Sequence, residues 1–211
     1  MSPVTCHLSI SLDGFVAGAH QSPTAPIGEG GLRLHEWATA TRAWRAQHGE
    51  PGGQAGPDSD IAARVADHVG AYVMGRRMFG GGEGAWDPDW RGWWGEDPPF
   101  HVPVFVLTHH PRESMAMEGA TTFHFVTGGP SEALARARQA AGAGDVAVAG
   151  GALTVRQFLA AGLLDELLLH IVPVVLGAGE RLLENVGDPV LAPAEVVASP
   201  AVTHIRYRVI H

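Results

Sequence analysis

The segment DVAVAGGALTVRQFLAAGLLDELLLHIVPVVLGAG, residues 145–179, is the part of the chain that decides the fold. It begins with a short strand pattern at 145–149, passes through two glycines and continues into a helical pattern over about 154–161. A long and nearly continuous apolar strand is predicted at 166–176, interrupted by Pro173. Strand, helix and strand in this order are typical of an α/β sheet with parallel pairing.

The rest of the chain extends this alternation. Residues 4–13 alternate apolar and polar side chains, which is the two-residue period of a strand. Two strands without a helix between them end the chain, so we expect antiparallel pairing there. We predict a single α/β domain over residues 1–211. The further elements are strands at 71–74, 102–108, 121–126, 195–199 and 202–210, and helices at 34–47, 58–69 and 131–141.

Composition excludes several classes of function. All 14 basic residues are arginine, so a Schiff-base lysine and a complete Walker A loop are absent. The net charge of −8 disfavours nucleic acid and anionic membranes as partners. Cys6 is the only cysteine, no signal peptide is evident, and the apolar stretch 167–179 is too short to span a bilayer. We therefore expect a cytoplasmic, soluble protein.

Two junctions between a strand and a helix could bind an anion. The first is Gly75-Arg76-Arg77, and the second runs from Gly150 to Thr154. Backbone N–H groups at a helix start attract phosphate, and guanidinium groups add charge-assisted hydrogen bonds. In the alternative reading, Gly75 ends a strand and both arginines are solvated.

Several motifs, taken in chain order, resemble the dihydrofolate-reductase-like superfamily. The nearest branch is the one that contains the C-terminal reductase domain of riboflavin-biosynthesis enzymes. The resemblance implies a three-layer fold, with a mixed, mostly parallel eight-stranded sheet, C-terminal antiparallel strands and helices on both faces. It also implies NADPH as the hydride donor, a planar pterin-like or pyrimidine-like substrate and a homodimer. The motifs are Ser11–Ala17, Val73–Phe79, Val104–Thr108, Gly150-Gly151, Gly162–Leu167 and Ile171–Gly179.

The resemblance also assigns residues to the cofactor. Ala17 would lie on the nicotinamide side, and Thr108 with His109 would hold the 2′-phosphate. The adenosine-phosphate end would face Gly75, Arg76 and Arg77. The pyrophosphate turn would consist of Gly150, Gly151, Ala152, Leu153 and Thr154, with a cis bond between the two glycines.

On the substrate side the chain departs from these relatives. His7 stands where riboflavin-pathway reductases tend to have lysine, and Ala149 stands where they tend to have glutamate. These departures put the ribosylamino-pyrimidine substrate in doubt. Glu36 is the candidate for the carboxylate that a dihydrofolate reductase places on its first helix, or else it lies on an exposed face. Asp13 could be a relay acid or could form a turn with Gly14.

Aromatic and histidine side chains complete the candidate site. His7 and His170 fall on strands that would be neighbours, so they form a polar pocket floor or are buried histidines with satisfied hydrogen bonds. The segment 80–100 holds four tryptophans, including Trp86. This segment is either a substrate-facing lid or a dimer contact. Histidine spacing indicates no metal site.

The sequence thus predicts an NADPH-dependent reductase of a small planar heterocycle. Two alternatives remain open. One is the riboflavin-pathway 5-amino-6-(5-phosphoribosylamino)uracil reductase itself. The other is a non-catalytic module that binds a nucleotide or a flavin, because fold does not fix function.

Overall fold

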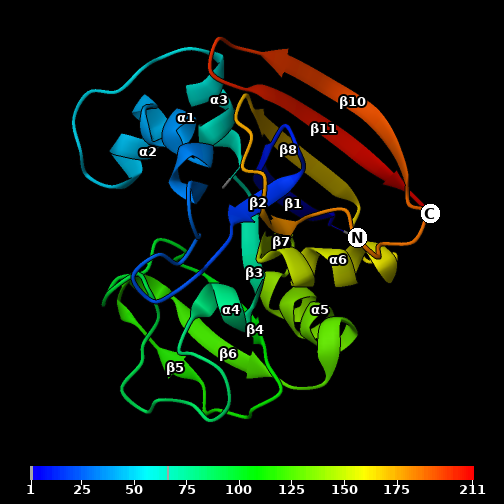
Figure 1. Ribbon diagram of the computed structural model, residues 1–211. Coiled ribbons are helices and arrows are strands. Elements are labelled where there is room, and N and C mark those ends of the chain that lie inside the picture. Colours follow the sequence, from blue (N-terminus) through cyan, green and yellow to red (C-terminus); the bar gives the residue numbers. More distant parts are fainter. Residues whose placement is uncertain (1, 66) are drawn as a thin grey trace. The chain divides into compact units, whose positions relative to one another are not determined.

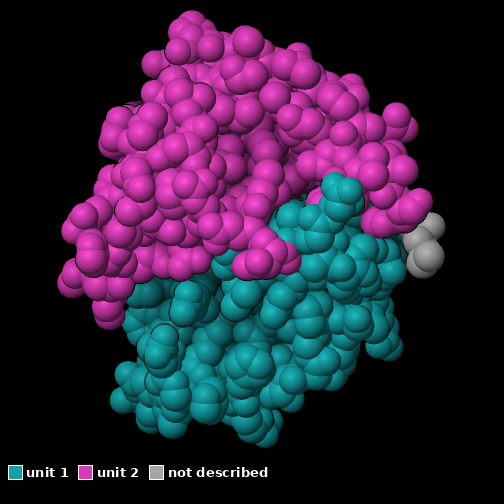
Figure 2. All heavy atoms as spheres, turned by 45° about the vertical axis from the view of Figure 1, so that its right-hand side comes forward, with its two compact units in different colours: residues 1–6, 68–165, 186–188 teal, residues 7–67, 166–185, 189–211 magenta. Residues whose placement is uncertain are grey.

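The computed structural model describes residues 2–65 and 67–211. They form two compact units built from interleaved segments (Figure 2). Strand β1 (Val4–Ser11) contributes residues 4–6 to unit 1 and the remainder to unit 2. Unit 1 comprises residues 1–6, 68–165 and 186–188, and unit 2 comprises residues 7–67, 166–185 and 189–211.

Unit 1 is a mostly parallel sheet in the strand order β1-β7-β3-β4-β6-β5 (Figure 1). Pairing is parallel from β1 to β6, and the short β5 runs antiparallel to β6. Apolar runs build the central strands because such strands are covered on both faces. The strands are β3 (Val69–Gly75), β4 (Pro103–Leu107), β5 (Met115–Ala116), β6 (Thr122–Val126) and β7 (Asp145–Gly150). The helices are α4 (Arg76–Phe79), α5 (Gly129–Ala141), α6 (Ala152–Ala160) and the 3-10 turn η2 (Glu118–Ala120).

The two faces of the β4–β6 region are covered differently. Helix α5 covers one face, where Arg136 lies 5.6 Å from the ring centre of Phe105. The other face carries a buried apolar cluster of Met74, Phe79, Val104, Val106, Phe123 and Phe125. Trp86, Trp90 and Trp94 pack against this cluster. The tryptophan-rich segment thus covers this face of the sheet, and three of its tryptophans pack on the buried cluster.

Gly80 allows this segment to approach the sheet. It ends α4 with φ 86°, a conformation that favours glycine. A Cβ on Gly80 would lie 2.6 Å from Trp93 and 2.7 Å from Trp90. The tryptophans therefore pack directly on glycine backbone.

Unit 2 holds the antiparallel part of the fold. Its strands follow the order β1-β8-β11-β10, and a separate ribbon pairs β2 with β9. The strands are β2 (Phe15–Gly18), β8 (Glu166–Val172), β9 (Gly179–Arg181), β10 (Val190–Ala198) and β11 (Thr203–Ile210). The helices are η1 (Gly31–Leu34), α1 (Glu36–Thr39), α2 (Arg42–Gln47) and α3 (Pro57–Arg64).

The fold class is confirmed, with three local corrections. The main sheet has nine strands among the described residues instead of eight, because it includes the two-residue strand β5. The helix predicted at 34–47 is broken, since Thr41 Oγ1 accepts a hydrogen bond from the Trp44 N–H and starts a new helix. The strand predicted to 176 ends at Val172, just before Pro173, which has no N–H to donate.

Replacing Phe79 by alanine tests the core of unit 1. Phe79 is fully buried and its ring contacts Trp86, Phe123 and Phe125. We expect the Phe79→Ala variant to lose about 3–5 kcal/mol of unfolding free energy, measured by urea denaturation. Val190→Ala, at a side chain that is 60% exposed, is the control and should change stability by less than about 0.5 kcal/mol. A loss below 1 kcal/mol for Phe79→Ala would contradict this account of the core.

Candidate cofactor and substrate residues

The turn between β7 and α6 in unit 1 is open above its second glycine. The Gly150-Gly151 bond is cis, as predicted. Gly151 is the N-cap of α6, no side chain caps this helix, and a Cβ on Gly151 would meet no atom within 4 Å. An uncapped helix start with free space before it is suited to a phosphate group.

The end of β3 lies against this turn. A Cβ on Gly75 would collide with Thr154 Oγ1 in the first turn of α6. Gly75 is also in register with Leu107, which directly precedes Thr108. The structure therefore brings together three of the predicted positions, Gly75, Thr154 and Thr108, at the same ends of neighbouring parallel strands.

The two arginines after Gly75 are held differently. Arg76 donates to the carbonyl of Gly84 at 2.7 Å, and its guanidinium lies 3.8 Å from the ring centre of Trp86. The Arg77 side chain is 69% exposed, and its Nη2 atom lies 3.9 Å from Glu83 Oε1. Arg77 is thus the more accessible of the two guanidinium groups.

Trp86 is fixed on several sides. The guanidinium of Arg112, which the sequence analysis did not single out, lies 5.2 Å from the Trp86 ring centre and is a second cation–π partner beside Arg76. Trp86 Nε1 donates to the carbonyl of His110 at 2.8 Å. This position explains Trp86 as a packing residue, and its contact with a substrate stays a prediction.

Thr108 and His109 differ in exposure. Thr108 is buried and its hydroxyl accepts a hydrogen bond from the His110 N–H at 3.1 Å. His109 is exposed in the turn that follows β4. The hydroxyl shapes this turn, which leaves the exposed imidazole as the group that a phosphate could reach.

In unit 2, Asp13 holds the loop after β8. Its carboxylate accepts hydrogen bonds from the Ser11 hydroxyl at 2.6 Å, the Leu176 N–H at 3.1 Å and the Gly177 N–H at 2.7 Å. The Ser11 hydroxyl, together with these backbone N–H groups, lowers the pKa of Asp13 to about 2. Asp13 is therefore ionised at neutral pH and is poorly suited to supply a proton.

Two other predicted residues of unit 2, Ala17 and Glu36, differ in solvent exposure. Ala17 is buried in β2, whereas Glu36 is exposed in the first turn of α1. The exposure of Glu36 agrees with the second of the two readings that the sequence left open.

His7 and His170 do come together. Their ring centres lie 6.0 Å apart, and His170 is 2% exposed. The ring of Trp37 lies 4.6 Å from that of His170. Burial lowers the pKa of His7 to about 4, and burial together with the neighbouring imidazoles lowers the pKa of His170 to about 2. Both imidazoles are thus neutral at physiological pH.

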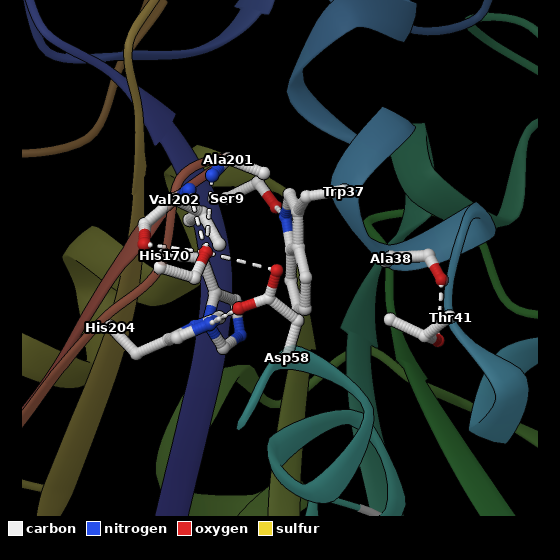
Figure 3. A network of polar contacts seen from close by, with 10 residues as sticks. Ser9, Trp37, Ala38, Thr41, Asp58, His170, Ala201, Val202 and His204 are labelled. Carbon is white, nitrogen blue, oxygen red and sulfur yellow. Dashed lines mark hydrogen bonds and ion pairs between the residues drawn. The ribbon is translucent and has the colours of Figure 1, made fainter. Parts of the chain in front are cut away.

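Two residues that the sequence analysis did not name continue this cluster (Figure 3). His204 of β11 is paired in register with His170 of β8, and their Nδ1 atoms lie 2.7 Å apart. His204 Nε2 lies 3.1 Å from Asp58 Oδ1, and Asp58 Oδ2 accepts a hydrogen bond from the Ser199 hydroxyl at 2.9 Å. The sequence offered one sign of this extension, which is that His204 falls in the strand predicted at 202–210.

The fold and these residues define an α/β protein with a mixed, mostly parallel main sheet. The family model of the RibD C-terminal domain matches residues 3–205, so the chain belongs to that family. None of the curated proteins compared with the chain matches it.

Solved structures of similar fold are distant in sequence. A riboflavin biosynthesis protein from Shewanella sp. PV-4 is 21% identical with a TM-score of 0.64, and the match covers 99% of each chain. A pyrimidine reductase-like protein from Corynebacterium diphtheriae is 14% identical with a TM-score of 0.52, over 100% of this chain and 92% of the other. The riboflavin biosynthesis reductase Rib7 of Saccharomyces cerevisiae is 14% identical with a TM-score of 0.56, over 100% and 89%. At these identities the likeness establishes the fold.

Two desolvated, neutral histidines, one half-buried and one buried, make stability depend on pH. His7 and His170 titrate near 6.5 when unfolded but near 4 and 2 when folded, so the unfolded state binds more protons below pH 6.5. The unfolding free energy should therefore be constant above pH 7 and fall as pH drops below 6.5, by up to about 1.4 kcal/mol per pH unit for each histidine. Urea denaturation between pH 4.5 and 8 measures this slope.

Two variants make this prediction specific. His7→Asn should flatten the slope between pH 6.5 and 4.5. His20→Asn should leave the slope unchanged, because His20 is exposed and its φ of 56° suits asparagine. An equal effect of both substitutions would contradict the assignment of the slope to the desolvated histidines.

Proposed function

We propose that this protein is an NADPH-dependent reductase that transfers a hydride to a small planar heterocycle, either pterin-like or pyrimidine-like. The observation that carries the proposal is the open, uncapped turn at Gly151, set against Gly75 at the end of β3. Membership of the RibD C-terminal domain family supports an oxidoreductase on this fold. NADPH would supply the hydride, and the protein would bind and orient the reactants.

The residues of unit 1 fit the phosphate groups of a dinucleotide. The first turn of α6 would hold the pyrophosphate through backbone N–H groups, and Gly151 leaves space for its oxygens. Arg77 and His109, both exposed, would bind the 2′-phosphate that distinguishes NADPH from NADH. Because the chain has no lysine, arginine, histidine and helix N–H groups must provide every positive contact.

The polar residues of unit 2 would contact the heterocycle. His7 and His170 present neutral imidazoles that can accept or donate a hydrogen bond without carrying a charge. An uncharged floor of this kind favours the amide and amine edges of a pterin or pyrimidine over an anionic group. His7 stands where riboflavin-pathway reductases tend to have lysine, so a substrate without the ribosyl phosphate is favoured.

Replacing Arg77 by alanine tests the cofactor assignment. The variant should bind NADPH about 10-fold more weakly while its affinity for NADH stays within a factor of two, because only the 2′-phosphate contact is lost. Quenching of tryptophan fluorescence in titrations with each nucleotide measures both affinities. Arg77 is a cleaner choice than Arg76, whose guanidinium also packs on Trp86.

Arg33→Ala is the matched control, since Arg33 is an exposed arginine of unit 2. It should leave both nucleotide affinities unchanged. Equal losses for NADPH and NADH in Arg77→Ala would remove Arg77 from the 2′-phosphate site. The absence of saturable quenching of the wild-type protein by either nucleotide would refute the reductase proposal.

A further inference from the structure

The chain Asp58–His204–His170 has a direction that hydrogen-bond chemistry fixes. An ionised carboxylate only accepts, so His204 Nε2 must donate to Asp58 Oδ1 across 3.1 Å. In a neutral His204 the Nδ1 atom then carries a lone pair and accepts from His170 Nδ1–H across 2.7 Å. His170 Nε2 is left as an acceptor.

The inner end of this chain lacks a partner. His170 Nε2 is buried and has no hydrogen-bond partner among the described residues. A buried polar atom without a partner loses its hydrogen bonds to water and gains none in return, so its retention calls for an explanation. The outer end is different, because the Asp58 side chain is 18% exposed while that of His204 is 1% exposed. The chain thus leads from a carboxylate near solvent to a buried nitrogen.

One added proton reverses the chain. When His204 carries protons on both nitrogens, it remains paired with Asp58 through Nε2 and donates through Nδ1 to His170. His170 then holds its own proton on Nε2, which becomes a donor. His170 stays neutral in both states, in keeping with the burial that lowers its pKa to about 2.

We propose that Asp58, His204 and His170 form a proton relay that supplies the proton of the reduction through His170 Nε2. This inference rests on the proposed function. The reduction adds a hydride from NADPH to carbon and one proton to the other atom of a C=N or C=C bond. The Nε2 proton moves to that atom, directly or through one water, while the His204 Nδ1 proton moves to His170 Nδ1. Once the product has left, a proton from water binds His170 Nε2 and the His170 Nδ1 proton moves back to His204 Nδ1, so the relay is recharged by the reverse of these two transfers.

The surroundings support a relay in preference to an isolated base. The titratable groups that interact with His170 come from several elements: His7 from β1, His204 from β11, and His35, which precedes α1. Burial also lowers the pKa of His7 and of His35. Asp58 at the start of α3 is therefore the carboxylate that can stabilise a charged imidazole in this cluster, and it contacts His204. Asp13, the other acid considered, is committed to the loop at 176–177.

Packing holds the relay in place. The Trp37 ring lies 4.6 Å from His170 and 4.9 Å from His204, and Trp37 Nε1 donates to Ser9 Oγ at 3.0 Å (Figure 3). Both imidazoles therefore keep their orientation when the proton moves. The Ser199 hydroxyl orients Asp58 by donating a hydrogen bond to Oδ2, the carboxylate oxygen that His204 does not contact.

The tautomers can be read directly from protein labelled with ¹⁵N-histidine. Two-bond ¹H–¹⁵N spectra from pH 5 to 8.5, assigned with His170→Asn and His204→Asn, should show His170 protonated on Nδ1 at high pH and on Nε2 at low pH. His204 should gain a second proton over the same range. A proton on His170 Nε2 at high pH, or on both nitrogens of His170 at low pH, would overturn the relay.

Kinetics with NADPH and a pterin or pyrimidine substrate test the role of the relay. Asp58→Asn should lower kcat by about 10²–10⁴-fold at pH 8 and leave the NADPH affinity within a factor of two. Asp97→Asn is the control, because Asp97 lies 3.6 Å from His101 in an exposed Asp–His pair and should not affect kcat. If Asp58→Asn does not fold, Ser199→Ala should raise the pH at which the relay takes up its proton, since Asp58 loses a hydrogen-bond donor.

The outcomes separate the two proposals. Wild-type kcat in a folded Asp58→Asn variant, or an unchanged titration in Ser199→Ala, would overturn the relay and leave the reductase in place. If the wild-type protein binds no nicotinamide nucleotide, the reductase proposal is overturned, and so is the role of the relay in reduction. This holds even if the histidine tautomers are those expected.

Discussion

The alternation of side chains along β1 decides which side chains this strand buries in unit 1 and which polar groups it places in unit 2. Val4 and Cys6 are buried on the apolar face and pair β1 with β7 in unit 1. Further along the same strand, His7 and Ser9 place polar groups in unit 2, where Ser9 accepts from the Trp37 indole and His7 faces the His170 ring. Because the period of a strand is two, a register shift of one residue would exchange these faces. Such a shift would bury the wrong side chains in both units.

Sequence patterns predicted the units unequally. The parallel strands of unit 1 are continuous apolar runs, so the sequence pattern alone located them. The strand-to-helix turn at Gly150-Gly151 was also located from the sequence, and its role in binding a cofactor stays a prediction. The broken helices at 31–47 were missed because Leu34, Trp37 and Trp44 keep a helical spacing across the cap at Thr41. The two-residue strand β5 is too short to leave a pattern.

The candidate site shows the same limit in chemical terms. His7 and His170 could be paired from the expected neighbourhood of their strands, and the structure brings their rings together. The contact of His204 with Asp58 could not be predicted, because the two residues are 146 positions apart in the sequence and only the folded chain brings them together. Three tryptophans of segment 80–100 pack against the apolar cluster of unit 1, and the lid and dimer-contact readings of this segment stay predictions. Tryptophan spacing carries no information about which surface a flexible, glycine-rich segment will cover.

Trp37 has an optical consequence. Its indole is 7% exposed and lies beside both imidazoles of unit 2. A protonated imidazole quenches the excited state of an adjacent indole, whereas a neutral one does so far less. In the proposed relay, the emission of Trp37 would therefore report when His204 carries the proton, because the two rings are adjacent.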